Sequence, residues 1–235
     1  MFKELLDLLI DPISKENLSL KVFLQAQNII QDGFLCHNNN WYPVINGIPR
    51  MFTGQLRKEF FLHYPDFFKK YKNDLPEAVF QEKKLLFGEK ITDQHHLRHQ
   101  LKTKKSFSYE WQNLYKENDF EMQNFLHFIR PTNKEDFQDK VCLDVGCGSG
   151  RFTKMAAMCG AKMVIGLDLG ESVETAQEMT KSCNNVQIVQ ADIYSLPFKD
   201  SIDLAFSIGV LHHLPSPQQG FNSILTALKP KGEII

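Results

Sequence analysis

The stretch LDVGCGSG at residues 143–150 decides the fold, because an apolar run ends there in closely spaced glycines. Glycines let the backbone turn sharply out of a strand and lie against a ligand without a Cβ in the way. A dinucleotide-binding fingerprint of the form G-x-G-x-x-G would place its third glycine at position 151, where Arg151 stands. The stretch therefore predicts a ligand-binding loop after a strand and argues against a nicotinamide cofactor.

Residues 141–235 continue this pattern by alternating β-branched runs with helix-like segments. The runs lie at residues 141–145, 163–168, 186–192 and 202–210. Such alternation predicts βαβ units, and hence an α/β fold with a Rossmann-like, doubly wound, mostly parallel sheet over residues 140–235. Because ligands of these sheets bind at the carboxyl ends of the strands, we expect the chemistry to lie there.

Two acidic residues stand where the next two runs end. Asp168 follows Gly146 by about 20 residues, where a carboxylate can accept hydrogen bonds from both hydroxyls of a ribose. Asp192 ends the third run, where a carboxylate can accept from the exocyclic amine of adenine. A single aspartate at such a place could equally be a helix N-cap or a solvated loop charge. Taken with the glycine loop, the two acids predict a site for an adenosine-containing ligand.

With these residues in hand, residues 141–235 resemble the class I S-adenosylmethionine-dependent methyltransferases. LDVGCGSG matches the first motif of that family, GLDLGES the second and QADIYSLPF the third, while FSIGVLHHLPSP and LKPKGEII match later ones. The resemblance implies S-adenosylmethionine as cofactor. It carries the binding role onto Asp144, Gly146, Cys147, Gly148, Gly150, Asp168, Leu169, Asp192, Ile193, Gly209 and Val210.

By the same resemblance, each part of the cofactor has its own residues. Asp144 approaches the methionine amino group, and the glycine loop lines the methionine and the ribose. Asp168 binds the ribose hydroxyls, Asp192 and Ile193 frame the adenine, and Gly209 with Val210 forms the opposite wall.

A sulfonium is already an activated methyl donor, so the protein must chiefly align the acceptor and exclude water. A general base is optional. His212 and His213 follow the fourth run, and imidazole titrates in the useful range, so they are the catalytic candidates. The alternative is that they make a structural contact or line the pocket.

Residues 1–53, called the N-terminal module below, have the pattern of a small α+β unit with an Asn46-Gly47 hairpin turn. On LLDLLIDPIS and WYPVINGIPRMF, the module resembles the zinc-ribbon activator domain that accompanies some tRNA and protein methyltransferases. In that family two cysteine pairs hold zinc. The corresponding positions here are Asp11, Ser14, Cys36 and Asn39, which do not make an ordinary zinc site, so we expect the metal to be lost.

Residues 54–139 are rich in Phe, Tyr, Lys and Glu, which predicts a helical linker or lid with aromatic faces. These aromatics are either core residues or the lining of a pocket for an apolar substrate. A basic stretch at 95–105 contains His95 and His99; we interpret it as a solvated face, with a phosphate-bearing substrate or RNA backbone as the alternative. SFSYEW at 106–111 resembles the segment that precedes this domain in bacterial relatives, where it would fold over the cofactor pocket.

The composition is that of an ordinary globular protein, with 43% hydrophobic and 23% charged residues and a net charge of −1. This balance argues against a general polyanion binder, although a local basic patch would not show in the sum. Five scattered cysteines favour a reducing compartment. Because no run approaches the ~20 apolar residues of a membrane span and the start lacks a signal-peptide core, we expect a cytoplasmic protein.

The resemblance also implies a sheet with further strands beyond residue 235, so we expect an incomplete domain whose exposed strand edge pairs with itself or with a partner. The predicted function is methyl transfer by in-line displacement to a small-molecule, glycan or lipid-linked acceptor. The alternatives are a cofactor-binding but inactive fragment or partner-binding module, and an RNA methyltransferase, with nucleic acid the less favoured substrate. The identity of the acceptor stays open.

Overall fold

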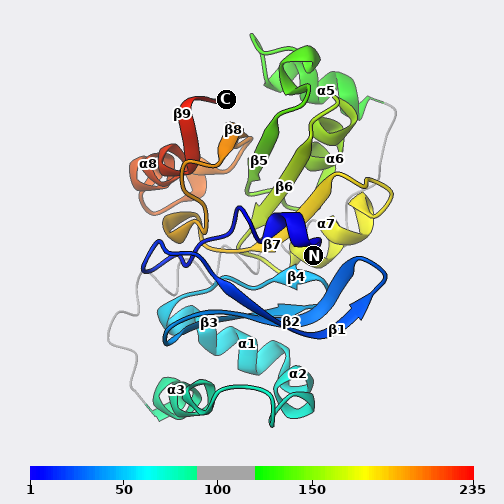
Figure 1. The fold of residues 1–235 in the computed structure, drawn as a ribbon. Helices are drawn as coiled ribbons and strands as arrows, with labels where there is room; N and C mark the ends of the chain where they lie inside the picture. Colours follow the sequence, from blue (N-terminus) through cyan, green and yellow to red (C-terminus); the bar gives the residue numbers. More distant parts are fainter. Residues whose placement is uncertain (89–119) are drawn as a thin grey trace.

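The computed structural model describes residues 1–88 and 120–235 (Figure 1). The basic stretch at 95–105 and the SFSYEW segment lie outside the described residues, so the predictions made for them stay predictions. In the described part, no helix combines the length and the apolar character that crossing a membrane requires.

A five-stranded parallel sheet forms the centre of the C-terminal region and confirms the predicted α/β class. Its strands are β5 (Val141–Val145), β6 (Met163–Asp168), β7 (Val186–Gln190), β8 (Ile202–Phe206) and β9 (Leu228–Ile234). Their order is β7-β6-β5-β8-β9, with every neighbouring pair parallel. The order reverses between β5 and β8, which is the place where such sheets bind ligands. The third and fourth strands end earlier than predicted, at Gln190 and Phe206.

Both faces of this sheet are covered, as a parallel sheet requires. The covering helices are α5 (Glu121–Phe128), the 3₁₀ turn η3 (Lys134–Phe137), α6 (Arg151–Met158), α7 (Ser172–Thr180) and α8 (Pro217–Ala227). Cys142 of β5 packs in one hydrophobic cluster with residues of α5, α6 and α7. Its neighbour Leu143 packs in the other cluster, with α8 and the N-terminal module. The alternation of side chains along β5 thus supplies two cores.

The N-terminal module forms a second, antiparallel sheet. Its elements are the 3₁₀ turn η1 (Lys3–Leu5) and the strands β1 (Ser19–Ala26), β2 (Ile29–His37), β3 (Asn40–Ile45) and β4 (Ile48–Pro49), in the order β1-β2-β3-β4. The predicted hairpin turn is present, since Asn46 and Gly47 both have positive φ, at 53° and 79°.

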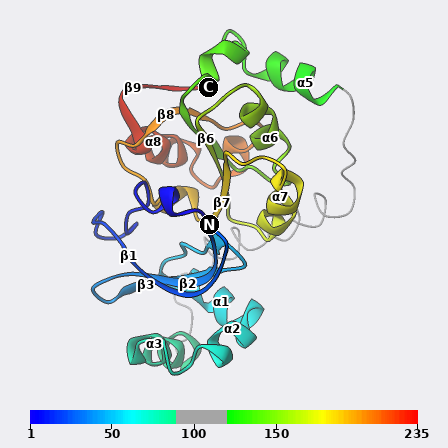
Figure 2. The same ribbon diagram turned by 45° about the vertical axis from the view of Figure 1, so that its right-hand side comes forward.

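The two sheets meet along β7, and Figures 1 and 2 show the blue and cyan module directly beside this strand. Arg50 forms a parallel bridge with Gln190, and the Met51 amide donates to the Gln190 carbonyl at 2.7 Å. Leu5, Leu9 and Tyr42 of the module are fully or almost fully buried in the cluster that contains Val145. The module therefore shares a hydrophobic core with the parallel sheet.

The aromatic residues of the helical segment lie in a core. Its elements are η2 (Gly54–Arg57), α1 (Lys58–His63), α2 (Pro65–Lys70) and α3 (Glu77–Gly88), which lie on the far side of the antiparallel sheet (Figure 2). Phe60, Phe61 and Phe68 are at most 5% exposed and pack against Trp41 of β3. These rings stabilise the module, so the core interpretation holds for them; Phe107, Tyr109, Trp111 and Tyr115 lie outside the described residues.

Asp11, which stands at the first of the four zinc positions, is fully buried in a hydrogen-bond network. Its carboxylate accepts from the hydroxyls of Tyr42 (2.6 Å) and Ser14 (2.7 Å), the amide of Asn40 (2.6 Å) and the backbone N–H of Ile13 (3.1 Å). Burial by itself would raise the pKa of Asp11, but these hydrogen bonds outweigh it and the pKa lies below its usual range.

We expect Asp11→Asn to lower the free energy of unfolding by about 1–3 kcal/mol at pH 7, because an amide turns one acceptor into a donor that faces other donors. The depressed pKa means that wild-type Asp11 stabilises the protein above its unfolded pKa and loses this effect as the pH falls through the folded pKa. The difference between variant and wild type should therefore shrink in acid. Urea unfolding measures it; exposed Asp7→Asn is the control, and equal effects of the two changes would contradict the prediction.

Candidate functional site

The glycine loop after β5 has a backbone conformation that residues with side chains rarely adopt. Gly146, Gly148 and Gly150 have φ values of 81°, 54° and 83°, in the left-handed region that glycine adopts without strain. The amides of Gly146 and Cys147 both donate to the carbonyl of Leu167, at 2.7 and 3.0 Å. The end of β6 therefore anchors the start of the loop.

The loop also packs tightly against its surroundings. A Cβ on Gly146 would lie 2.4 Å from a methyl carbon of Val210, and one on Gly150 would lie 3.0 Å from the backbone of Ala176 in α7. The structure thus brings the glycine loop against the segment that follows β8; the role of Val210 in binding the cofactor stays a prediction. A Cβ added to Gly209, in contrast, would meet no atom of residues 1–88 or 120–235 within 4 Å.

We expect Gly146→Ala to lower the free energy of unfolding by about 1–3 kcal/mol, since it adds both backbone strain and a clash with Val210. Gly209→Ala is the matched control, because Gly209 also has a positive φ, 74°, but its added Cβ would meet no atom in the part of the chain that the structure describes. Combining Gly146→Ala with Val210→Ala should restore the part of the lost unfolding free energy that is due to the clash. Chemical denaturation measures all of these variants; a Gly146→Ala variant as stable as Gly209→Ala would show that the contact is unimportant.

Asp168, at the end of β6, connects two loops. One carboxylate oxygen accepts from the Gly148 amide at 2.9 Å, and the other accepts from the Gly170 amide at 2.7 Å. Burial raises the pKa of Asp168, and the backbone hydrogen bonds oppose that rise. The side chain of Ser172 and the backbone of Leu169 also hydrogen-bond to Asp168, so several donors hold its carboxylate in place.

Asp144, in β5, is a buried carboxylate with only 2% of its surface exposed. Burial raises its pKa to about 7, and the neighbouring charge of Asp168 adds to the rise. The hydroxyl of Thr153 in α6 donates to it at 2.6 Å. A cationic ligand group stabilises the ionised form of such a buried carboxylate, and the amino group of a methionine is a cation of this kind.

Asp192 is the N-cap of the 3₁₀ turn η4 (Ile193–Ser195) and accepts from the Tyr194 amide at 3.1 Å. The helix-cap interpretation therefore holds for one carboxylate oxygen. The side chains of three other predicted residues lie in hydrophobic clusters: Cys147 and Ile193 in the two cores of the parallel sheet, and Leu169 against the aromatic core. These three can meet a ligand chiefly through their backbone.

His212 and His213 lie in the 3₁₀ turn η5 (Leu211–His213) after β8, and both are exposed. Their ring centroids are 3.8 Å apart. Their place beside Val210 puts them next to the segment that contacts the glycine loop. The catalytic role of either histidine stays a prediction.

Sequence reasoning missed Thr153 and Gln190. Gln190, the last residue of β7, donates from its side-chain nitrogen to the carbonyls of Leu169 and Gly170, at 3.2 and 3.1 Å. The register of β7 could have pointed to Gln190, because it is paired with Asp168 in the sheet. No local signal identifies Thr153 as the partner of Asp144.

Among the described residues, Glu59, His63 and Glu171 form a group with metal-ligand atoms within 4.8 Å of one another. The two nitrogens of His63 face the carboxylates of Glu59 and Glu171 at 3.7 and 3.5 Å. This group connects α1 to the start of α7 and includes none of the four positions expected to have lost zinc.

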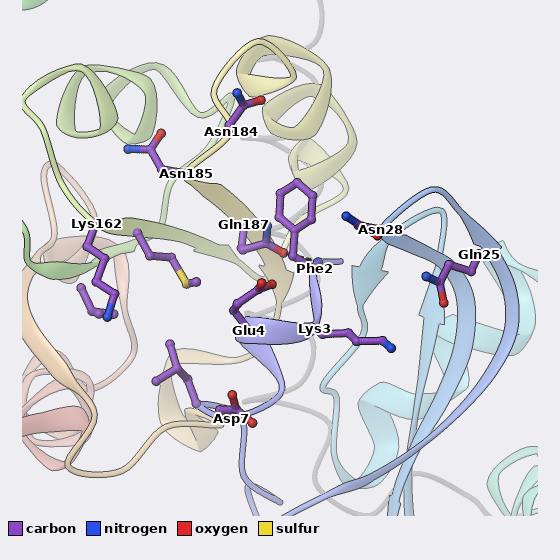
Figure 3. A pocket seen from close by; sticks show the side chains of 13 residues that line it. Phe2, Lys3, Glu4, Asp7, Gln25, Asn28, Lys162, Asn184, Asn185 and Gln187 are labelled. Carbon is purple, nitrogen blue, oxygen red and sulfur yellow. Dashed lines mark hydrogen bonds between the residues drawn. The ribbon is translucent and has the colours of Figure 1, made fainter.

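A groove of about 920 Å³ opens at the other edge of the parallel sheet, where β5 and β6 begin (Figure 3). Lys3, Glu4 and Asp7 lie on one side of it and Lys162 and Asn185 on the other (Figure 3). The groove is therefore separate from the carboxyl ends of the strands.

Residues 143–235 match the family model described as a methyltransferase domain. The tRNA U34 carboxymethyltransferase of Ruthia magnifica subsp. Calyptogena magnifica is 30% identical over 121 residues, which cover 50% of this chain and 36% of that protein. The protein of the same name from Histophilus somni (strain 2336) is 28% identical over 176 residues, covering 69% and 52%. The chain thus spans about half or less of the length of these relatives.

A solved S-adenosylmethionine-dependent methyltransferase from Mesorhizobium loti is 30% identical, covers 48% of this chain and 51% of its own, and has a TM-score of 0.41. By the family match, residues 143–235 are a methyltransferase domain, as the motifs predicted. S-adenosylmethionine is the cofactor of this domain.

Proposed function

We propose that this protein binds S-adenosylmethionine at the carboxyl ends of β5, β6 and β7 and transfers its methyl group to an RNA acceptor. The observation that carries the proposal is the double contact of Asp168, which ties the glycine loop at Gly148 to the turn at Gly170. Such a carboxylate is pre-organised before any ligand arrives, and pre-organisation lowers the cost of binding.

The residues fit the parts of the cofactor. The two oxygens of Asp168 suit the two hydroxyls of the ribose, and the buried carboxylate of Asp144 suits the ammonium group of the methionine. Asp192 lies just beyond β7, where a carboxylate can accept from the adenine amine, and no described side chain or backbone atom fills the space beside Gly209. S-adenosylmethionine supplies an activated methyl group, and the protein aligns the acceptor and excludes water.

The names of the relatives support RNA as the acceptor, in place of the small-molecule, glycan or lipid-linked acceptor favoured by the sequence. The basic stretch at residues 95–105 supplies cationic side chains of the kind that neutralise phosphates. We place His212 or His213 as the group that takes the acceptor's proton, because both are exposed beside the pocket wall at Val210. A tRNA acceptor also leads us to propose a cytoplasmic location.

The N-terminal module is proposed to be a zinc-ribbon-like activator unit without zinc. The network around Asp11 supports this, because four donors already occupy the carboxylate that stands at one ligand position. Elemental analysis of protein purified without chelators tests it. Stoichiometric zinc that disappears in a Cys36→Ser variant would contradict it.

The test of the main proposal is a labelling experiment with S-adenosylmethionine that carries an isotope in its methyl group. The protein is incubated with unmodified tRNA in one reaction and with an RNA-free metabolite extract in another. We expect label in the tRNA, and mass spectrometry of its nucleosides distinguishes an added methyl group from an added carboxymethyl group. His212→Ala and His213→Ala test the base.

Each other outcome has a definite meaning. Label in the metabolite fraction alone would overturn the RNA acceptor and restore the small-molecule interpretation. Cofactor binding without turnover on either substrate would favour an inactive, cofactor-binding module. Absence of cofactor binding in calorimetry would overturn the proposal as a whole.

A further inference from the structure

Arg50, just after β4, is a fully buried arginine that reaches from the N-terminal module into the methyltransferase domain. One terminal nitrogen donates to the side-chain oxygen of Gln190 at 2.9 Å. The other donates to Glu174 of α7 at 2.5 Å, and the guanidinium carbon lies 4.8 Å from the ring centre of Tyr64. A single side chain thus connects the module to both β7 and α7.

Gln190 transmits this contact to the turn after β6. Its side-chain nitrogen donates to the carbonyls of Leu169 and Gly170, while the amide of Gly170 donates to Asp168 at 2.7 Å. Gly170 is therefore held at both its N–H and its C=O. The two contacts together define where the carboxylate of Asp168 points.

The orientation of the Gln190 amide follows from the chemistry of its partners. A guanidinium has only donors and a carbonyl has only acceptors, so Arg50 must face the amide oxygen while the two carbonyls face the amide nitrogen. With the amide turned round, its oxygen would face two carbonyl oxygens and its nitrogen would face a cation. Arg50 therefore selects the one orientation that can hold Leu169 and Gly170.

Docking of the two sheets does not by itself explain why position 50 holds a buried, charged arginine side chain. The backbone bridge of Arg50 with Gln190 and the hydrogen bond from Met51 need no particular side chain. Burying a charged group is costly unless it is paired and hydrogen-bonded, and an apolar residue of similar size would often pack at least as well. Among the described residues, the buried Nε atom of Arg50 has no hydrogen-bond partner, which adds to that cost.

We propose that Arg50 is a positioning residue of the cofactor site: it orients the amide of Gln190, which fixes the turn at residues 169–170 and thereby aims Asp168 at the ribose. This inference rests on the proposed function, because it takes the ligand of Asp168 to be the ribose of S-adenosylmethionine. It gives the N-terminal module a direct influence on cofactor affinity.

The sharpest test is Gln190→Glu. The change keeps the size of the side chain and keeps an oxygen for Arg50, now as an ion pair, but replaces the nitrogen that holds two carbonyls with an oxygen that repels them. If the contact served docking only, the variant would bind cofactor as the wild type does. We expect the Kd for S-adenosylhomocysteine to rise about tenfold or more, and the Kd for adenosine, which keeps the ribose, to rise by a similar factor.

Arg50→Met is the second variant, and Arg57→Met is its matched control. Arg57 is also buried in the N-terminal region, donates to Glu82 and the Phe52 carbonyl, and stacks on Trp41. Among the described residues, it has no hydrogen bond to residues 168–171. Whatever the two changes do to the melting temperature, we expect only Arg50→Met to lose cofactor affinity.

Calorimetry with folded protein, checked by circular dichroism, decides between the outcomes. In an Asp168→Ala background, Arg50→Met should cause little additional loss, because both changes act on the same contact. Wild-type affinity in Gln190→Glu, or equal losses in Arg50→Met and Arg57→Met, would overturn the positioning role while the proposed function stands. A wild-type protein that binds no cofactor would instead overturn the proposed function.

Discussion

Asp168→Ala is expected to weaken the binding of S-adenosylmethionine by about a hundredfold or more. The change removes the acceptor for the ribose hydroxyls and also the two backbone contacts at Gly148 and Gly170. A hydrogen bond to a charged group contributes about 1.5–3 kcal/mol, and the loss of two such bonds corresponds to at least a hundredfold in Kd. Isothermal titration calorimetry with purified protein measures the effect.

Asp203→Ala is the matched control for this prediction. Asp203 also accepts a backbone N–H, from Val141 at 2.8 Å, and pairs with Lys229 at 2.7 Å, but it lies near the start of β8, away from the carboxyl ends. We expect this variant to be less stable than the wild type and to bind cofactor with unchanged affinity. Equal cofactor affinity in wild type and Asp168→Ala would refute the assignment of the ribose site.

The affinity for S-adenosylmethionine is expected to rise with pH up to about 7. Burial raises the pKa of Asp144 to about 7, so below that pH the unliganded carboxyl group is largely protonated. Binding of the ammonium group favours the ionised form, and the proton must leave. The Kd should therefore increase by up to about tenfold for each pH unit below 7.

Asp144→Asn should abolish this slope and leave the affinity near the low value of the wild type in acid. Adenosine lacks the ammonium group, so its affinity should not follow the Asp144 titration in either protein. Calorimetry between pH 5.5 and 7 distinguishes the cases. A wild-type Kd that is constant over this range would show that Asp144 does not meet the ammonium group.

The same raised pKa has a consequence for stability. The folded protein holds the Asp144 proton more tightly than the unfolded chain does, so stability falls as the pH rises from about 4 to about 7. Asp144→Asn lacks this penalty. Its free energy of unfolding, relative to wild type, should therefore be larger at pH 8 than at pH 4, and an equal difference at both pH values would contradict the raised pKa of Asp144.

Local patterns in the sequence determined the central sheet, the glycine loop and the place of Asp168. Alternating β-branched and helical segments specify parallel strands, and glycine spacing specifies a left-handed turn, because both depend on residues that are neighbours in the chain. The carboxyl ends of parallel strands share one edge, so the order of the strands along the chain is enough to predict that Asp168 and Asp192 contribute to one site.

Other features required the tertiary structure, because they join segments that are far apart in the chain. Arg50 and Gln190 meet across 140 positions, and nothing near either residue marks it as a partner of the other. The change in composition after residue 53 predicts a separate N-terminal module, yet the module shares a core with the parallel sheet. Composition and periodicity report which face of an element is apolar; only the packing of elements decides what that face meets, and which buried polar groups must find each other there.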